Sequence, residues 1–440
     1  PQLVTREDGT QVMRVRKRKR RSKQPHKEAE AKRRRRSLGV AAVVTLLVLL
    51  CGLGAIGGII YLNSASHREK VVVRLSEWSG AETSLVEFRT TPVSVAASKV
   101  EFVWPGDSVV SKLVVNGVRG DLKIASHLSN EWTGNQLTAA NGGELVLRAA
   151  KGEAGASRVR PEGKLPFQFS YRVPKFRVRF GDGVSPAVAV TGTDASFLVP
   201  DRSRAAASVV LEGGKTRIGK WGVFNVHFGS ILLEEGEVRL GNLQLRPEAS
   251  QEAEIRLLGD DMQPLMTRGG DSELRVKFAG VPSTDLFGQG LGKIVQGVFE
   301  SPGDEENTGR CFVDLTELGS LRIVAPIRTG LSAGAGLKGL DLFADLGRVL
   351  ESESVSRPVF ESEARAILLR DDQSTRLNEI EFVAQGVVRV RGNLEAGAGG
   401  KLSGLIDVGL PEATVLASAS GEVKRLFIRR DLGHMWASVS

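Results

Sequence analysis

A stretch of 25 residues without a charged side chain, Leu38 to Leu62, restricts what this chain can fold into more than any other feature. As an α-helix rising about 1.5 Å per residue, it is longer than the roughly 30 Å hydrocarbon core of a bilayer. The apolar region of a cleaved signal peptide is shorter, about 7 to 15 residues. The sequence therefore predicts an uncleaved signal anchor, a single transmembrane helix over residues 37–62.

Basic residues precede this stretch and set its expected orientation. Residues 1–36 hold 15 Lys and Arg against 4 Asp and Glu, whereas residues 37–440 hold 45 against 47, so the net charge of +9 comes from the tail. Four consecutive arginines, Arg33, Arg34, Arg35 and Arg36, stand one residue before the stretch. The positive-inside rule places the tail, which we expect to be disordered, in the cytoplasm and the chain from residue 63 onward outside it.

The basic run from Arg14 to Arg21 also fits a nuclear-import or nucleic-acid-binding patch. Because a spanning helix follows so closely, we interpret the run as a determinant of topology that also contacts anionic lipid head groups. The nearly neutral remainder of the chain gives no electrostatic reason to expect a nucleic-acid partner.

Beyond the anchor, apolar and polar residues alternate in many short runs, the period-2 pattern of half-buried strands. Turn sequences such as Asn116-Gly117 separate the runs, and few long excursions interrupt them, which favours an antiparallel meander. We expect a mainly β fold, an elongated antiparallel sheet that forms a curved groove or a sandwich. Among the alternating runs are Val71-Val73-Leu75, Phe167-Phe169-Tyr171, Phe176-Val178-Phe180, Phe224-Val226-Phe228 and Ala364-Ala366-Leu368.

One or two short helices interrupt the β pattern. Ser283 is a candidate cap for a helix whose apolar stripe runs from Leu286 to Phe299, and a weaker stripe runs from Leu342 to Leu350. The expected organisation is a tail (1–36), an anchor (37–62), a β-rich region (63–280), a helix-containing segment (281–355) and a second β region (356–440). Since the alternation still continues at Ser440 and no Met precedes Pro1, we expect a segment of a longer protein.

Residues with catalytic chemistry are sparse. None of the five histidines has the spacing of a metal site. Gly288 to Lys293 resembles a phosphate loop, but Phe287 replaces its first glycine and Ile294 its Ser or Thr. Two cysteines make no disulfide framework, and we interpret Cys311 as a buried strand residue. We therefore predict a chain that is not an enzyme and has no cofactor and no metal site.

The C-terminal part carries a recognisable arrangement of glycines and apolar residues. One predicted strand has the pattern V-x-V-x-G-x-L, Val388 to Leu394, and the next has G-x-L-x-G-x-I-x-V, Gly400 to Val408. Leu426-Phe427-Ile428 and Trp436 to Val439 follow as closing strands. From Leu337 onward the chain resembles the C-terminal region of AsmA-like proteins, and the order of an anchor followed by a long β region is similar to theirs. The 36-residue tail is longer than is usual in that family.

The resemblance implies an envelope protein of bacteria with two membranes, anchored in the inner membrane with its bulk in the periplasm. Such proteins are thought to hold or move lipid, or to assist outer-membrane assembly, through an apolar β groove. The implied partners are membrane lipid and other envelope proteins. The residues that we expect to line the groove are Phe167, Phe169, Phe176, Phe180, Phe224 and Phe228.

A closed β-sandwich remains an equal alternative for the same residues. Those phenylalanines would then fill a core, and the chain would be a non-enzymatic scaffold that binds protein or cell-wall partners. An enzyme acting on envelope glycans would need paired carboxylates converging in a cleft, and the sequence identifies no such pair.

Overall fold

The computed structural model describes most of the chain as two compact units, Pro1–Leu62 and Asn63–Ser440. The described residues are 2–14, 24–106, 108–127, 132–148, 167–181, 186, 188–198, 207–218, 221–234, 237–259, 265, 272–303, 308–313, 321–329, 334–338, 340–360, 364–397 and 401–440.

The first unit contains the predicted anchor. Helix α1 (Gln24–Leu62) includes one segment, Ala41–Leu62, that is long and apolar enough to cross a membrane. The helix therefore begins well before the apolar stretch, and it includes the backbone of all four arginines at its border. Within the tail expected to be disordered, strands β1 (Gln2–Thr5) and β2 (Gln11–Arg14) pair as a short hairpin.

The second unit begins with a helix where the sequence pattern predicted a strand. Helix α2 (Ala65–Ser79) contains the valines of Val71-Val73-Leu75, so that prediction was wrong. The Ser64 side chain accepts a hydrogen bond from the His67 backbone N–H, and Gly80 ends the helix in the left-handed conformation with φ of 67°. These two caps satisfy free backbone groups at both ends, and they outweigh the weak preference of valine for strands.

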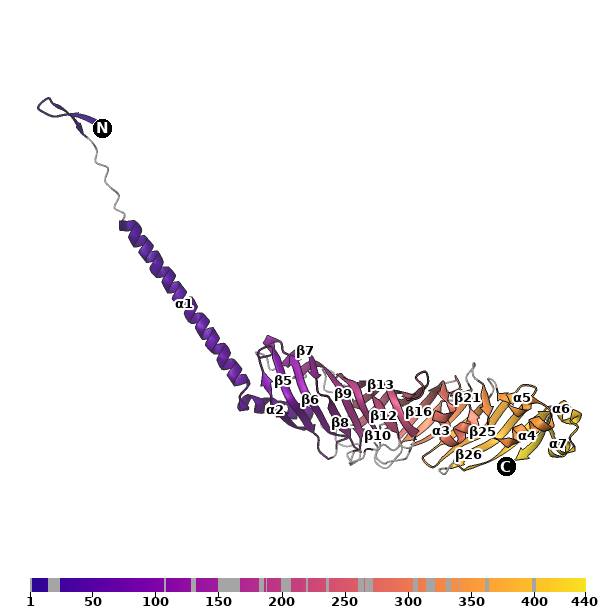
Figure 1. The fold of residues 1–440 in the computed structure, drawn as a ribbon. Coiled ribbons are helices and arrows are strands. Elements are labelled where there is room, and N and C mark those ends of the chain that lie inside the picture. Colours follow the sequence, from indigo (N-terminus) through magenta and orange to yellow (C-terminus); the bar gives the residue numbers. More distant parts are fainter. Residues whose placement is uncertain are drawn as a thin grey trace. The chain divides into compact units, whose positions relative to one another are not determined.

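The rest of the second unit is mainly one long antiparallel ladder whose strands pair in the order of the sequence, as Figure 1 shows. Among the described residues, no pairing joins its first strands to its last, so the ladder has two ends. Its strands are β3 (Glu82–Val86), β4 (Arg89–Thr90), β5 (Ser94–Val103), β6 (Val110–Asp121), β7 (Trp132–Ala139), β8 (Gly143–Leu147), β9 (Phe167–Phe180), β10 (Val188–Leu198), β11 (Ala207–Glu212), β12 (Lys215–Ile218), β13 (Gly222–Glu234), β14 (Glu237–Pro247), β15 (Glu254–Gly259), β16 (Ser272–Ala279), β20 (Gly309–Val313), β21 (Leu321–Thr329), β24 (Arg365–Arg370), β25 (Ser374–Ala384), β26 (Val388–Gly397), β27 (Leu402–Pro411), β28 (Arg429–Asp431) and β29 (His434–Val439).

The expected meander has one exception. Strands β7 and β8 pair antiparallel with β6 but parallel with β9, so the connection between β8 and β9 crosses over. Asn116-Gly117, predicted as a turn, instead lies inside β6. Gly117 has φ of 65°, and its carbonyl accepts a hydrogen bond from the Ala140 N–H at the bend between β7 and β8. Gly117 therefore kinks strand β6, which stays continuous opposite the break between β7 and β8.

Two excursions from the ladder form a second layer on its C-terminal half. The first, between β16 and β20, contains a helix over Ser283–Ile294, and the second, between β21 and β24, contains one over Asp341–Val349. A three-stranded sheet joins the two excursions. Their elements are β17 (Val281–Pro282), α3 (Ser283–Ile294), β18 (Val295–Gln296), β19 (Val298–Glu300), β22 (Ala335–Leu337), α4 (Asp341–Val349), α5 (Glu353–Ser356) and β23 (Val359–Phe360). The other short helices among the described residues are η1 (Ile124–His127), α6 (Glu412–Ala417) and α7 (Gly421–Leu426).

The two predicted helices are present, but the first is shorter than its apolar stripe. Helix α3 ends at Ile294, and Val298 and Phe299 belong to strand β19. Gly288, with φ of 76° and ψ of 179°, breaks α3 in the middle, and Ser283 donates its hydroxyl to the Gly292 carbonyl instead of capping the helix. The phosphate-loop-like run is therefore part of a kinked packing helix.

Most strands of the ladder from β8 onward have an inner face that contributes to a large buried cluster, the main core, and an outer face rich in charged residues. The main core runs from Val109 to Met435. Helices α3 and α4 bury Leu286, Phe287 and Phe343 in it, so the second layer covers the inner face. The prediction of a mainly β fold with few helices is confirmed, and the structure adds that its C-terminal half has two layers.

Cys311 is buried in β20, as the sequence predicted, with 1% of its surface exposed. Burial raises the pKa of its thiol to about 12, so at neutral pH the reactive thiolate is scarce. In a Cys51→Ala background we expect thiol reagents to label Cys311 at least about 100-fold faster in denaturant than in the folded chain, because labelling requires opening of the core. Labelling at equal rates in denaturant and in the folded chain would contradict the burial.

The pKa of the Cys311 thiol is higher in the folded chain than in the unfolded chain. We therefore expect the free energy of unfolding to fall as pH rises above 9.

Candidate functional site

The inner face of the ladder is the candidate site, and the six predicted phenylalanines occupy different parts of it. Phe176, Phe180 and Phe224 are fully covered by protein, with 0%, 6% and 3% of their surface exposed, and they belong to the main core. Phe169 is half-buried. Phe167 begins β9, but its side chain lies outside the described residues.

Phe228 lies on the other face. A register shift between Val226 and Phe228 pairs Phe228 with Glu212 on one neighbouring strand and Gln244 on the other. The extra residue of this bulge moves the side chain from the inner to the outer face. A bulge of this kind leaves no mark on an alternating apolar pattern, so the sequence placed Phe228 with the inward residues.

The inner face is only partly covered at the N-terminal end of the ladder. The half-exposed apolar residues there are Val100 and Phe102 of β5 and Leu113 and Val115 of β6. Val100 pairs with Val115, and Phe102 pairs with Leu113, so the four residues share one face of two adjacent strands. Leu113 and Val115 pack at the edge of the main core. These four residues, the open apolar end, are only partly buried, whereas most of their counterparts in later strands are buried.

Helix α2 covers a neighbouring part of the same strands. Val71 packs with Val95, Leu122 and Trp132 in a small cluster that is separate from the main core. His67 stacks against Trp132 at a ring distance of 6.2 Å. The apolar interior therefore consists of two packed clusters, and the open apolar end lies on the strands that also carry the smaller one.

One charged side chain lies inside the apolar interior. Arg370 ends β24 on the face of Ala366 and Leu368, and only 8% of its surface is exposed. Its Nη1 donates to the carbonyls of Asp285 and Leu286 on α3, at 2.8 and 2.7 Å. The kink at Gly288 interrupts the helix just beyond these carbonyls, so the arginine satisfies acceptors that the broken helix leaves free.

Arg370 also joins distant parts of the ladder. Its guanidinium carbon lies 3.8 Å from the centre of the Trp221 ring, which directly precedes β13. Burial lowers the pKa of Arg370 to about 10, and the charges of Asp285 and then Asp372 oppose that effect, so the side chain is still cationic at neutral pH. Because β13 and β24 are separated by several intervening strands, this contact means that the sheet is strongly curved here.

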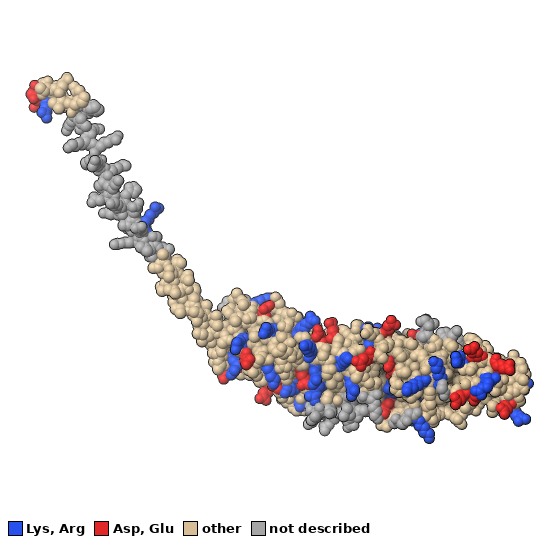
Figure 2. Space-filling model, viewed as in Figure 1, with Lys and Arg blue, Asp and Glu red and all other residues tan. Residues whose placement is uncertain are grey.

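The outer face carries charges of both signs. Figure 2 shows Lys and Arg interspersed with Asp and Glu over the visible face of the second unit. Lys112 on the adjacent strand β6, and then Lys99 on the same strand β5, lower the pKa of Glu101 below its usual value by direct hydrogen bonds. No patch of one sign dominates the visible face, which does not favour a polyanionic partner.

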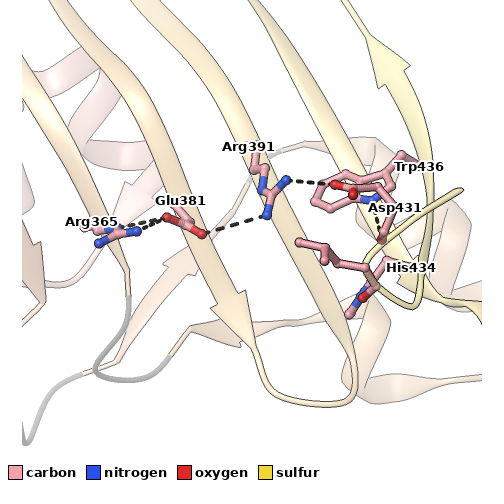
Figure 3. Close-up of polar contacts among 7 residues, drawn as sticks. Arg365, Glu381, Arg391, Asp431, His434 and Trp436 are labelled. Atoms are coloured by element: carbon pink, nitrogen blue, oxygen red, sulfur yellow. Dashed lines mark hydrogen bonds and ion pairs between the residues drawn. The ribbon is translucent and has the colours of Figure 1, made fainter. Parts of the chain in front are cut away.

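A row of ion pairs crosses the outer face of the C-terminal strands (Figure 3). Arg365 Nε donates to Glu381 at 2.9 Å, and Arg391 lies 4.0 Å from Glu381 and 3.3 Å from Asp431. Arg391 also lies over the Trp436 ring at 4.7 Å. Each carboxylate thus has an arginine partner, so the row links β24, β25, β26 and β28 instead of forming the opposed carboxylates of a glycosidase.

Replacement of Glu381 by glutamine is expected to lower the free energy of unfolding by less than about 1 kcal/mol, because these pairs are largely solvent-exposed. The difference from wild type should shrink further at 1 M salt. Chemical denaturation at low and high salt measures it. A large, salt-independent loss would show that the row stabilises the fold by more than surface ion pairing.

In the described part of the chain, no group of three or more His, Cys, Asp and Glu side chains is placed to hold a metal ion. Comparison of the chain with protein-family models, with curated proteins and with solved structures gives no match. The arrangement itself therefore supplies the argument for function: an apolar inner face, an end where that face is open, and a candidate membrane span in the same chain.

Proposed function

We propose that this chain is a non-enzymatic, membrane-anchored envelope protein of the AsmA type that holds or moves lipid, or assists outer-membrane assembly, on the inner face of its sheet. Its anchor would lie in the inner membrane, with the N-terminal tail in the cytoplasm and the second unit in the periplasm. Acyl chains would contact the open apolar end, and polar head groups would remain at the charged rim.

The half-exposure of Val100, Phe102, Leu113 and Val115 is the observation that supports this proposal most directly. An apolar surface that a protein leaves uncovered favours an apolar ligand or partner. Asn63, the first residue of the second unit, directly follows the candidate span in sequence. Bilayer lipid is therefore the apolar ligand that a chain with such an anchor meets first.

The second layer restricts where lipid would be held. Leu286 and Phe287 of α3 and Phe343 of α4 already cover the inner face of the C-terminal half. We therefore propose that acyl chains occupy the N-terminal strands, and that the C-terminal half is a packed β structure.

A non-enzymatic scaffold that binds protein or cell-wall partners is the second candidate. It is favoured by the complete burial of Phe176 and Phe224, which leaves the middle of the inner face without room for a guest. Under that alternative, the open apolar end would bind a protein partner instead of lipid.

Mass spectrometry of lipid extracted from the purified full-length chain distinguishes the two candidates. We expect bound lipid to be recovered from wild type and to be reduced in Leu113→Asp, because a charge would be placed among apolar contacts. The matched control is Val114→Asp, since Val114 is the next residue, is also half-exposed, and pairs with Glu101 and Glu144 on the outer face. Equal lipid recovery from both variants would contradict the proposal.

A further inference from the structure

The first unit carries apolar side chains that no described part of the chain covers. Strands β1 and β2 form a two-stranded sheet, and among the described residues neither pairs with a third strand. Leu3 and Met13 are 59% and 60% exposed, and Val4 and Val12 are both 43% exposed. A two-stranded hairpin alone is at best marginally stable in water, whereas a sheet of three or more strands with an apolar face is stable. This hairpin is therefore suited to form part of a larger sheet.

The hydrogen bonds of the hairpin determine which backbone groups are available to another strand. The Arg6 N–H donates to the Thr10 carbonyl at 3.1 Å, at the turn end of the hairpin. Along an antiparallel pair, residues whose backbone groups bond to the neighbouring strand alternate with residues whose groups point away from it. Leu3 and Thr5 lie an odd number of positions from Arg6, so their N–H and C=O groups point away from β2, along the free edge of β1.

The two edges of the hairpin differ in charge. Strand β1 contains no charged residue, whereas β2 ends at Arg14, the first residue of the basic run that continues to Arg21. Pairing of two copies through β2 would bring two such runs together, and like charges on adjacent strands repel. The uncharged edge of β1 is therefore the one at which another strand can be added.

Strand β1 is complementary to a second copy of itself. In an antiparallel pair with Val4 opposite Val4 of the second copy, Leu3 of each copy lies opposite Thr5 of the other. The outward N–H and C=O groups of Leu3 and Thr5 then bond to one another. The valines form one row across the four strands, in the order Val12, Val4, Val4 and Val12, and β-branched side chains pack well in such a row.

We infer that the N-terminal hairpins of two copies of this chain pair through β1 and form a four-stranded sheet. The inference goes beyond the proposed function and uses only its anchor, because anchored copies share one membrane and meet at a high effective concentration. Four hydrogen bonds and one row of valines make a small interface, so the pairing depends on that confinement.

Disulfide trapping of the full-length chain in isolated membranes tests this inference. In a Cys51→Ala background, Val4→Cys and Val12→Cys are a matched pair, since both residues are 43% exposed and share one face of the hairpin. Val4 would lie directly opposite its copy, at the close spacing that a disulfide needs, whereas the two Val12 residues would be three strands, or about 14 Å, apart. We expect at least about 10-fold more disulfide-linked dimer from Val4→Cys under mild oxidation. Equal yields from the two variants, or no dimer from either, would overturn the inference.

Proline substitutions identify the edge that pairs. Thr5→Pro removes an N–H that points away from β2, so the hairpin keeps its own hydrogen bonds but loses a donor on the free edge of β1. In the Val4→Cys chain it should lower the yield of dimer by about 10-fold or more, whereas Gln11→Pro, which removes an N–H on the free edge of β2, should leave the yield within about twofold. An equal loss from both substitutions would overturn the assignment to β1.

The outcome for the hairpins is separable from the outcome for the proposed function. If trapping fails while lipid is recovered from the chain, the hairpins do not pair, although the lipid-holding function stands. If trapping gives the expected dimer but no lipid is recovered, the hairpins pair and the proposed function fails.

Discussion

Replacing Gly404 or Gly392 by alanine is expected to lower the free energy of unfolding of the second unit by about 2–5 kcal/mol. The two glycines lie on the adjacent strands β26 and β27, two positions apart in register, with Gly392 paired to Ile406 and Gly404 paired to Leu394. A Cβ on Gly392 would lie 2.1 Å from the Leu405 carbonyl oxygen, and one on Gly404 would lie 2.3 Å from the Asn393 oxygen. Both contacts are with backbone, which cannot move aside without breaking the ladder.

Gly397 provides the matched control, since it ends the same strand β26 and a Cβ there would meet nothing within 4 Å. We expect Gly397→Ala to change stability by less than about 1 kcal/mol. Denaturant titration followed by circular dichroism measures all three variants. Equal effects at the three positions would mean that the close approach of β26 and β27 is not a constraint on the fold.

Truncation of Phe287 to alanine is expected to cost about 3–5 kcal/mol. Phe287 has 2% of its surface exposed, and its ring packs edge-on against Phe299 at 4.9 Å. Removal of the ring leaves a cavity between α3 and the inner face of the ladder. Because the interior is closely packed, the surrounding side chains fill this cavity only in part.

The same experiment tests whether the second layer belongs to the core. Val349→Ala on α4 is the control, because Val349 is 44% exposed and should cost less than about 1 kcal/mol. If the layer is part of the core, Phe287→Ala shifts the main unfolding transition. A separate early transition, with the main one unchanged, would show that the layer folds independently of the ladder.

Much of the ladder could be predicted from its period. Strands β9, β13 and β24 follow alternating runs, and the first helical stripe begins α3 at Ser283, because side chains that alternate in a strand must divide between a buried and an exposed face. The glycines of the AsmA-like pattern have a physical role at the approach of β26 and β27. That role explains why the pattern has glycine at Gly392 and Gly404, and it leaves the family assignment itself as a proposal.

Other features depend on contacts that no local pattern contains. The caps at Ser64 and Gly80 stabilise a helix in a valine-rich run that was predicted to be a strand. The strand predicted at Leu426-Phe427-Ile428 was also wrong, because Leu426 ends helix α7 and the next strand, β28, begins only at Arg429. The spacing of Leu377, Ile380 and Phe382 keeps all three buried only because β25 bulges between Leu377 and Ile380.

The candidate site was predictable in composition but not in detail. The sequence identified phenylalanines of the inner face, yet the half-exposed residues are on β5 and β6, where the period is no clearer than elsewhere. Trp221 and Arg370 belong to parts of the ladder that are far apart in strand order, so their contact could not be predicted from the sequence. The sequence shows an arginine at the end of an apolar strand, but the burial of Arg370 is visible only in the structure.

Site-specific photo-crosslinking at Leu113 and Val114 tests the central claim, that the inner face of the N-terminal strands contacts lipid. The two residues are adjacent in β6 and both half-exposed, but they point to opposite faces, so they differ only in the face that they sample. With the full-length chain in its native membrane, we predict crosslinks to lipid from Leu113 and few or none from Val114. Lipid crosslinks in equal yield from both positions, or from neither, would contradict the account.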